Sequence, residues 1–374
     1  MKITTKLGIL VLSISLFLLI TICEAQAAPR ISANCYCLLD TANRQVLAGQ
    51  NIDAIRPIAS TTKIMTAILA AEYCSKEEIA TVSNHAAKTA PYTMDLKSGQ
   101  TLTIEELLKI SLMRSANDAA VVIAEHVAGS EEFFAHLMNL KAFCLGALNT
   151  HFQNSSGLPA EQHYSTAYDL TLISSYSLQN PETAKWISTA ETYFQHPSNK
   201  QPTKITNTNP LLQTYAGANG VKTGTTDAAG PCLIGSAVRN QRQLIAVILN
   251  SSNRSGDCSK LLNYGFEHTT EYTVIDKAEL FKEIFLSDGE NPILQIYPSK
   301  NIVVWQEGAQ LKAHKQIDMN YQIPAPVIAG EKIGRLDLFI YSKYIGSVDL
   351  VAGNNVYRQR RPWLNAVKNL LKKE

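Results

Sequence analysis

The chain has 374 residues, a formal charge of +2 and 45% hydrophobic residues. This length is enough for two domains, and the composition is that of an ordinary globular protein. The nearly neutral charge gives no indication of a nucleic-acid partner.

The chain begins with the pattern of a secretory signal peptide over residues 1–27. Two lysines precede an apolar run from 7 to 22, and Ala25-Gln26-Ala27 is an A-x-A cleavage site. A retained membrane anchor is the alternative, although a membrane span needs about 20 apolar residues. Cys23 follows an isoleucine rather than a small residue, which argues against a lipoprotein anchor. Both alternatives place the body of the protein outside the cytoplasm.

Removal of the signal peptide leaves six of the seven cysteines: Cys35, Cys37, Cys74, Cys144, Cys232 and Cys258. An even number in an exported chain permits disulfides, but the irregular spacing favours free buried thiols. No C-x-x-C pair or Cys/His spacing indicates a zinc site. The sequence therefore predicts neither a metal nor another cofactor, and it leaves the disulfide state open.

Residues 34–40 and 45–48 are expected to form two strands joined by a turn at 41–44. An apolar pattern at helical spacing follows Ser60-Thr61-Thr62-Lys63. Ser60 should therefore lie at the start of a helix and Lys63 one turn later, on the same face. A serine beside a lysine is a nucleophile beside a possible base. The alternative is a helix-capping serine with a surface lysine.

The chain is expected to be mostly helical up to about residue 178. Thr103 and Glu106 form a capping-box pattern, and Ser130 begins another helix. Between these helices, Ser115-Ala116-Asn117 is a polar stretch flanked by apolar helical patterns. It should form a loop that both helices hold in place, although a plain helix junction with a capping residue is the alternative.

Loops are expected over residues 150–165 and 195–220, and three antiparallel strands should follow up to residue 249. The first strand carries Lys222-Thr223-Gly224. Glycine at 224 removes a side chain where another backbone could approach closely. A helix over residues 260–266 should close this region.

Residues 277–352 consist of short β patterns separated by turn residues, which predicts a small all-β domain. At the end of the chain, residues 361–374 carry an apolar stripe flanked by basic residues. This pattern predicts an amphipathic helix at a membrane surface, with anionic lipid as its partner. A helix packed on the β domain is the alternative.

Three motifs stand in order: Ser60-x-x-Lys63, Ser115-x-Asn117 and Lys222-Thr223-Gly224. Each is weak alone, but the ordered set is the signature of penicillin-binding proteins and class A β-lactamases. Residues 30–355 resemble the D-alanyl-D-alanine carboxypeptidases, the low-molecular-mass penicillin-binding proteins. The stretches that carry this resemblance are 59–66, 115–120, 163–170, 207–212 and 220–224.

The resemblance implies an α/β fold in which a penicillin-binding/β-lactamase-like domain combines an antiparallel sheet with a helical subdomain. This domain is expected over residues 28–270, a small C-terminal all-β domain over 277–355, and a terminal amphipathic helix over 360–374. It also implies a serine carboxypeptidase that removes the terminal D-alanine of the peptidoglycan pentapeptide in cell-wall biogenesis. β-Lactam antibiotics should acylate it, and it should lie on the outer face of the cytoplasmic membrane.

The resemblance also assigns roles to residues. Ser60 corresponds to the acylated nucleophile and Lys63 to its general base, while Ser115 and Asn117 relay protons and bind the substrate amide. The docking strand is Lys222, Thr223, Gly224 and Thr225, and Arg254 matches an arginine for the terminal carboxylate. The backbone N–H groups of Ser60 and Thr225 would form the oxyanion hole. The departures are Ala116, Thr225 and Pro231-Cys232, and the last pair leaves the lining of the site in doubt.

Two other functions are possible. A class A β-lactamase would carry Ser-Asp-Asn and a loop glutamate, but position 116 is alanine and Glu161-Gln162-His163-Tyr164 does not match that loop. A non-catalytic receptor for β-lactams or wall peptide would not need the nucleophile. The sequence does not indicate a vegetative or sporulation role, the preferred peptide, the contacts of the β domain or the oligomeric state.

Overall fold

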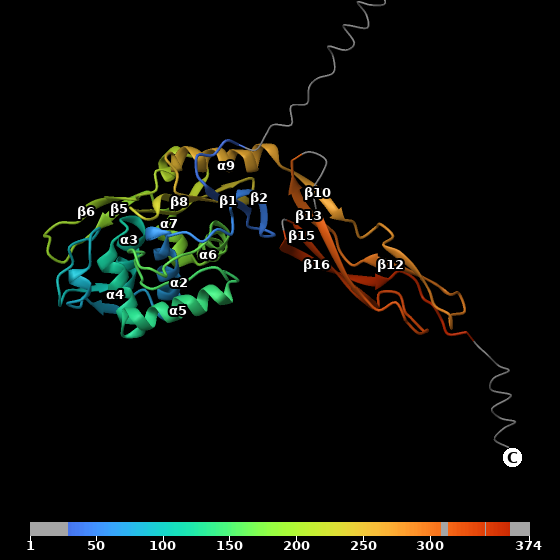
Figure 1. Cartoon of the computed structure of the whole chain (residues 1–374). Helices are drawn as coiled ribbons and strands as arrows, with labels where there is room; N and C mark the ends of the chain where they lie inside the picture. The colour runs from blue at the N-terminus through green and yellow to red at the C-terminus, as the bar shows by residue number, and fades with distance from the viewer. Residues whose placement is uncertain (1–28, 308–312, 341, 360–374) are drawn as a thin grey trace, which may run out of the picture. The chain divides into compact units, whose positions relative to one another are not determined.

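A computed structural model describes residues 29–307, 313–340 and 342–359. The predicted signal peptide and the predicted terminal helix over 360–374 lie outside the described residues. Within them, two main sheets are formed by separate parts of the chain (Figure 1).

The first sheet has five antiparallel strands in the order β2-β1-β9-β8-β7. Its strands are β1 (Cys35–Asp40), β2 (Gln45–Gln50), β7 (Ala218–Thr226), β8 (Gly230–Arg239) and β9 (Arg242–Leu249). The predicted hairpin and the three predicted strands are thus confirmed. The sheet brings the N-terminal hairpin beside strands that lie about 200 residues later in the chain.

Helices cover both faces of this sheet: α9 packs on β8 and β9, and α6 packs on β1 and β9 from the other side (Figure 1). The helices are α2 (Lys63–Tyr73), α3 (Ile104–Met113), α4 (Asn117–Ala128), α5 (Glu131–Cys144), α6 (Ala167–Gln179), α7 (Pro181–Ser188), α8 (Leu211–Thr214) and α9 (Arg254–His268). The connections between the helices include two short 3₁₀ turns, η1 (Ala59–Thr62) and η2 (Ala86–Lys88). They also include two small strand pairs: β3 (Ile79–Thr81) with β4 (Thr101–Thr103), and β5 (Glu191–Phe194) with β6 (Thr203–Thr206).

The predicted helix starts follow from their caps. Thr103 and Glu106 form the expected capping box at α3, and the Ser130 hydroxyl accepts the N–H of Phe133 at α5. The helix expected over 260–266 begins earlier, at Arg254, because the Asn253 side chain caps it. The expected loop over 195–220 was partly wrong, since β6 and α8 lie within it.

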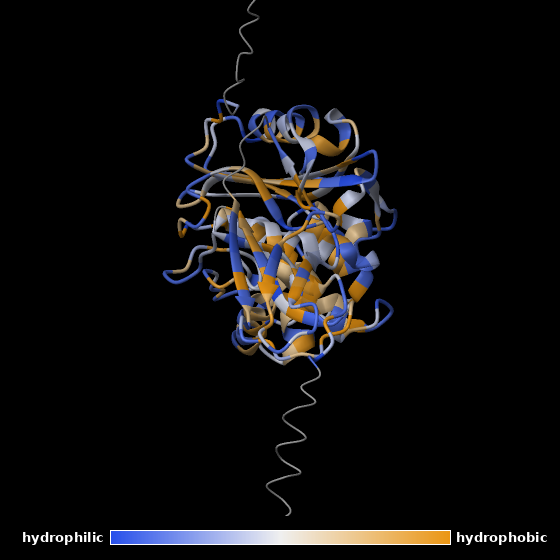
Figure 2. Ribbon diagram, turned by 90° about the vertical axis from the view of Figure 1, so that its right-hand side faces the viewer, coloured by the Kyte–Doolittle hydropathy of each residue, from blue (hydrophilic) through white to orange (hydrophobic). Residues whose placement is uncertain are grey.

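The hydrophobic core lies between the sheet and the helices α2, α4 and α6. Figure 2 shows hydrophobic and hydrophilic residues alternating along the ribbon, with hydrophobic ones gathered toward its middle. Helix α2 is buried over its first eight residues, from Lys63 to Ala70. A helix buried on all sides gives its polar side chains fixed surroundings. The fixed surroundings matter for Lys63, because its side chain is fully buried although lysine is rarely buried in proteins.

The C-terminal part is all-β, as predicted, with its own buried core. It contains a sheet ordered β11-β12-β16-β15-β14 and the pair β10 with β13. The strands are β10 (Thr270–Ile275), β11 (Lys282–Phe285), β12 (Ile293–Pro298), β13 (Ile302–Gln306), β14 (Ala313–Met319), β15 (Lys332–Ile340) and β16 (Lys343–Ala352). The sequence did not predict β10 and β11. Most of their residues are exposed, so they lack the alternation of apolar and polar residues that identifies a strand.

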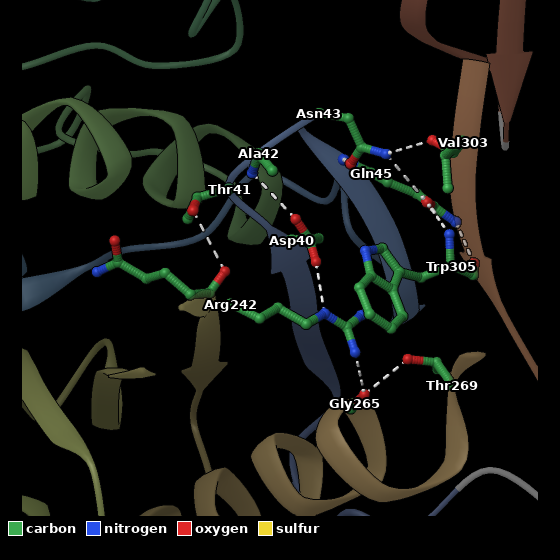
Figure 3. A network of polar contacts seen from close by, with 11 residues as sticks. Asp40, Thr41, Ala42, Asn43, Gln45, Arg242, Gly265, Thr269, Val303 and Trp305 are labelled. Carbon is green, nitrogen blue, oxygen red and sulfur yellow. Dashed lines mark hydrogen bonds and ion pairs between the residues drawn. The ribbon is translucent and has the colours of Figure 1, made fainter. Parts of the chain in front are cut away.

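A network of polar contacts joins this part to the first sheet (Figure 3). The Gln45 side chain donates to the carbonyl of Trp305 at 2.5 Å and accepts the N–H of Trp305 at 2.8 Å. The guanidinium of Arg242 lies 3.4 Å from the centre of the Trp305 ring and forms a 2.7 Å ion pair with buried Asp40. The side chain of Gln45 thus bonds the backbone of Trp305 as a neighbouring strand would.

All six cysteines of the described residues are free thiols. Cys35, Cys37, Cys232 and Cys258 are buried, as the sequence favoured, whereas Cys74 is partly exposed and Cys144 is exposed. The alternative of disulfides is not borne out.

Candidate active site

Ser60 lies in the 3₁₀ turn η1, and Lys63 is the first residue of α2. The Nζ of Lys63 is 3.0 Å from the Oγ of Ser60. In a 3₁₀ turn, residues i and i+3 are aligned one above the other, so the two side chains meet without further help. The sequence predicted this pairing correctly, although it expected an ordinary α-helical start. Ser60 is partly exposed, whereas Lys63 is buried.

The amine of Lys63 has three hydrogen-bond partners. Besides Ser60, it donates to Asn117 Oδ1 at 2.6 Å and to the carbonyl of Ser156 at 2.5 Å. The Asn117 amide is held with its oxygen toward Lys63, because its Nδ2 donates to the carbonyl of Ala90 at 3.0 Å. A neutral amine has two N–H donors and one lone pair. If Asn117 and Ser156 take the two donors, the lone pair points at the Ser60 hydroxyl.

Burial lowers the pKa of Lys63 well below its usual value, and the nearby charge of Lys222 lowers it further. Asp118 and Glu131 oppose this effect to a smaller extent. Burial, with a smaller contribution from Arg254, lowers the pKa of Lys222 to about 7. Burial and the neighbouring Lys222 thus make the charged form of Lys63 less favourable, as the expected role of a base requires.

The predicted loop at Ser115 lies one residue earlier than expected. Arg114, Ser115 and Ala116 join α3 to α4, and Asn117 is already the first residue of α4. Ser115 has a positive φ of 62° and is partly exposed, and its hydroxyl has no hydrogen bond within the described residues. Neighbouring Asp118 accepts the N–H groups of Met94 and Leu96, which fixes the preceding segment against α4.

Strand β7 places Lys222, Thr223 and Gly224 beside the Ser60 turn. A Cβ added to Gly224 would lie 2.9 Å from the backbone N of Ser60. The sequence expectation of a close backbone approach at this glycine is confirmed. Buried Lys222 donates to the carbonyl of Thr223 at 2.9 Å, and the Thr223 hydroxyl donates to Thr208 Oγ1 at 2.7 Å.

Arg254 lies at the start of α9 and reaches the same strand. Its Nη1 donates to the carbonyl of Gly224 at 3.0 Å and to Thr225 Oγ1 at 2.9 Å. It also donates to the carbonyl of Cys232, the β8 residue that pairs with Gly224. Cys232 itself is buried, so its thiol does not line the exposed side of the site. Arg254 and Lys222 supply positive charge along β7.

A second set of residues supports the Ser60 turn, and sequence reasoning gave it no role. His163 Nδ1 accepts the N–H of Gln153, so Nε2 carries the proton and donates to Thr62 Oγ1 at 2.7 Å. The Thr62 hydroxyl in turn donates to the carbonyl of Ala59 at 2.9 Å. Burial lowers the pKa of His163 to about 4, which keeps it neutral near pH 7.

Gly157 completes this support. Its φ is +85°, and a side chain there would collide with the carbonyl of Ala59. The nearby Ser156 carbonyl, which binds Lys63, belongs to the same loop. The stretch 154–157 was predicted as a loop from its composition, but a backbone carbonyl leaves no trace in a sequence that could have identified it as a partner of Lys63.

Comparisons with known proteins identify the family of the chain. The D-alanyl-D-alanine carboxypeptidase family, peptidase S11, matches residues 22–253, and the C-terminal domain of penicillin-binding protein 5 matches residues 270–358. The chain is 32% identical to D-alanyl-D-alanine carboxypeptidase DacF of Bacillus subtilis over 80% of each chain. It is 30% identical to DacC of Escherichia coli over 88% of this chain and 85% of that protein.

The fold is also similar to solved structures. Penicillin-binding protein 5 of Haemophilus influenzae has a TM-score of 0.69 and 26% identity, and the match covers 88% of this chain and 99% of that one. Together with the arrangement of Ser60, Lys63 and Asn117, these matches show that the chain belongs to the D-alanyl-D-alanine carboxypeptidase family of serine peptidases, the low-molecular-mass penicillin-binding proteins.

Proposed function

We propose that this protein is a serine-type D-alanyl-D-alanine carboxypeptidase that removes the terminal D-alanine of the peptidoglycan pentapeptide through an acyl-enzyme on Ser60. The single observation that carries the proposal is the 3.0 Å contact between Ser60 Oγ and the buried amine of Lys63. A serine hydroxyl needs a base to attack an amide near neutral pH, and burial lowers the pKa of this lysine, which makes its proton easier to remove.

Acylation begins when neutral Lys63 takes the Ser60 proton and Ser60 Oγ attacks the carbonyl carbon of the scissile amide. The backbone N–H groups of Ser60 and Thr225 then bind the tetrahedral oxyanion, typically worth about 3 kcal/mol per donor. When the C–N bond breaks, the proton on Lys63 passes to the leaving amine of D-alanine. Asn117 binds the substrate amide. Ser115, which is partly exposed, relays the proton from Lys63 to the leaving amine.

The terminal carboxylate of the substrate binds the positive edge of β7. Lys222, Thr223 and Arg254 supply the donors, and Gly224 leaves room for the peptide to pass along the strand. A carboxylate beside Lys222 raises the pKa of that lysine above its value of about 7 in the free protein. Substrate binding therefore increases the fraction of Lys222 that is positively charged, and this charge attracts the substrate carboxylate.

Water then attacks the acyl-enzyme, the ester bond breaks, and Ser60 regains its proton. β-Lactam antibiotics present a strained amide to the same serine and acylate it. The alternatives of a class A β-lactamase and a non-catalytic receptor are not favoured. The family and its relatives are named as carboxypeptidases, and a receptor would not need the pair of Ser60 and Lys63.

We further infer that the protein is exported and acts on the outer side of the cytoplasmic membrane. Its first 27 residues have the signal-peptide pattern, and residues 361–374 have the pattern of a peripheral membrane helix. In the part of the chain that the structure describes, no helix has the length and apolar character needed to cross a membrane.

The decisive experiment is incubation of the purified protein with a pentapeptide ending in D-Ala-D-Ala, followed by an assay of free D-alanine. Release of D-alanine that is lost in Ser60→Ala is expected. Labelled penicillin should attach to the peptide containing Ser60, as located by mass spectrometry. Covalent labelling without D-alanine release would support the receptor, and a labelled serine elsewhere would overturn the assignment of Ser60.

A further inference from the structure

Three side chains of different chemistry meet at the end of α2 that lies away from Ser60. Cys74 follows the last residue of α2, Glu78 precedes β3, and His126 lies in the last turn of α4. The Cys74 sulfur, a Glu78 carboxylate oxygen and a His126 ring nitrogen all lie within 4.8 Å of one another. We propose that these three residues bind a zinc-like divalent cation, in a site separate from the active site.

The ligand types favour this class of metal. A thiolate, an imidazole and a carboxylate together suit Zn²⁺, whereas Mg²⁺ and Ca²⁺ prefer oxygen ligands alone. In a tetrahedral zinc site, neighbouring ligand atoms lie roughly 3.4 to 3.6 Å apart. Glu78 Oε2 and His126 Nε2 are 3.2 Å apart, already near this spacing. Small side-chain rotations would bring the Cys74 sulfur to the same distance.

The carboxylate is held in place by its second oxygen. Glu78 Oε1 accepts the backbone N–H of Ser75 at 2.6 Å, which leaves Oε2 directed toward His126. Hydrogen bonds of this kind orient metal ligands and are typical of metal sites in proteins. A carboxylate already bonded through one oxygen can bind a metal through the other without losing its position.

The position in the fold is favourable for a cation. Helices α2 and α4 both end here, at Tyr73 and Ala128. The unpaired carbonyl groups and the macrodipole of a helix make its C-terminal end attractive to positive charge. Lys76 is the lysine nearest in sequence to the three proposed ligands. Its amine forms a 3.6 Å ion pair with Glu182, which is not one of those ligands.

Binding must displace a proton from the thiol. A cysteine thiol with an ordinary pKa of about 8.5 is protonated near neutral pH when no metal is bound. When the cation binds, the S–H proton passes to solvent, a metal–sulfur bond forms, and unprotonated His126 and Glu78 complete three ligands. Because Glu78 and His126 are exposed, water can take the fourth position.

The site should not affect catalysis directly. Helix α2 has 11 residues, so about 16 Å of helix separates Cys74 from the Ser60 turn. A bound cation would instead connect α2, α4 and the start of β3, and would stabilise the folded protein. This proposal is independent of the proposed carboxypeptidase function. It also departs from the sequence prediction of no metal, since the three ligands come from separate segments.

The test is a titration of the purified mature protein with Co²⁺ and with Zn²⁺. Co²⁺ bound by a thiolate gives an ultraviolet charge-transfer band, and calorimetry gives the zinc affinity and stoichiometry. One cation per chain is expected. Cys74→Ser should abolish the band, and Glu78→Gln and His126→Gln should each weaken binding at least tenfold. At zinc concentrations about 100 times Kd, the Tm of the unmodified protein should rise by roughly 5 °C.

Two matched variants serve as controls. Cys144→Ser removes an exposed thiol elsewhere, and His85→Gln breaks a comparable His–carboxylate pair with Glu125, also on α4. Both should bind cobalt and zinc as the unmodified protein does. Penicillin labelling of Ser60 shows that each variant is folded. A band that persists in Cys74→Ser, equal losses in the controls, or no stoichiometric binding by the folded protein would overturn the proposal.

Discussion

Asn117 Oδ1 accepts a 2.6 Å hydrogen bond from the amine of Lys63, and the other end of the same amide is fixed to the carbonyl of Ala90. Asn117 therefore fixes the Lys63 amine in addition to its proposed contact with the substrate. Because it and the Ser156 carbonyl occupy two positions around the nitrogen, they direct the third position at Ser60. The direction of the lysine lone pair thus depends on one side chain, Asn117, and one backbone carbonyl, that of Ser156.

Lys63→Ala should abolish this base without unfolding the protein. The rate of acylation by labelled penicillin should fall by about 10²- to 10⁴-fold, the usual contribution of a general base. Circular dichroism and Tm should show that the fold survives. Lys200→Ala, which changes an exposed lysine, is the control and should acylate normally. A normal acylation rate in Lys63→Ala would place the base elsewhere.

Asn117→Asp should move the pH profile of acylation toward alkaline pH. A carboxylate in place of the amide favours charged Lys63 and raises its pKa, so a higher pH is needed to reach the same fraction of neutral amine. Acylation rates measured from pH 5 to 10 test this. Asn117→Ala, which removes the hydrogen bond without adding charge, should be slower with no alkaline shift. Identical pH profiles for the two variants would contradict the argument.

Gly224→Ala should slow acylation at least tenfold. The new Cβ would lie 2.9 Å from the N of Ser60, so the Ser60 turn or β7 must move, and small displacements of reacting groups are costly. Gly346→Ala is a matched control in another strand, since its Cβ would meet no atom within 4 Å. Acylation kinetics of both variants decide the question, and an unaffected Gly224→Ala would show that the site tolerates a side chain there.

Much of this site could be predicted from sequence, because the pairs it contains are local or carried by strong patterns. Ser60 and Lys63 are three residues apart, and Lys222 to Gly224 lie on a clearly patterned strand. The partners supplied by tertiary structure could not be predicted: a backbone carbonyl at Ser156, and the support of Thr62 by His163. Both depend on how a loop about 95 residues later packs against the Ser60 turn.

The C-terminal part shows the same limit. Its class was evident from short β patterns, but β10 and β11 are largely exposed and lack apolar alternation. The contact between Gln45 and Trp305 joins residues 260 positions apart through a side-chain amide and a backbone. The local sequence cannot predict such a pair. Glutamine is common on protein surfaces, and nothing in the residues around Gln45 indicates that its side chain bonds the backbone of Trp305.

His163→Gln should make stability less dependent on pH. Folding lowers the pKa of His163 from its reference value near 6.5 to about 4, so between these values the unfolded chain binds a proton that the native chain does not. The stabilisation is therefore fully present above pH 6.5 and is lost as the pH falls toward 4, by roughly 3 kcal/mol in total.

Urea unfolding of both proteins at pH 7 and pH 4.5 measures this difference. The variant should be less stable at pH 7, because the Thr62 and Gln153 hydrogen bonds are altered, and should lose less stability at pH 4.5. His136→Gln, at an exposed position of α5, should retain the pH dependence of the unmodified protein. A variant at His163 with that same dependence would show that another group is responsible.

Deletion of residues 361–374 should release the protein from membranes while leaving its activity intact. The stretch is too short to span a bilayer, which needs about 20 apolar residues. Its apolar residues are Trp363, Leu364, Val367, Leu370 and Leu371, whose spacing predicts one stripe if the stretch forms a helix. The surrounding lysines and arginines would each contribute about 1 kcal/mol near an anionic surface.

Sedimentation with anionic liposomes separates this anchor from a helix packed on the β domain. The full mature protein should pellet with the vesicles, and less of it should pellet at high salt, because salt screens the lysine and arginine charges. The truncated protein should stay in the supernatant, release D-alanine from soluble pentapeptide at the same rate, and keep its Tm, since no packed helix is lost. Equal partitioning of the two forms, together with a lower Tm after truncation, would instead favour a helix that packs on the β domain.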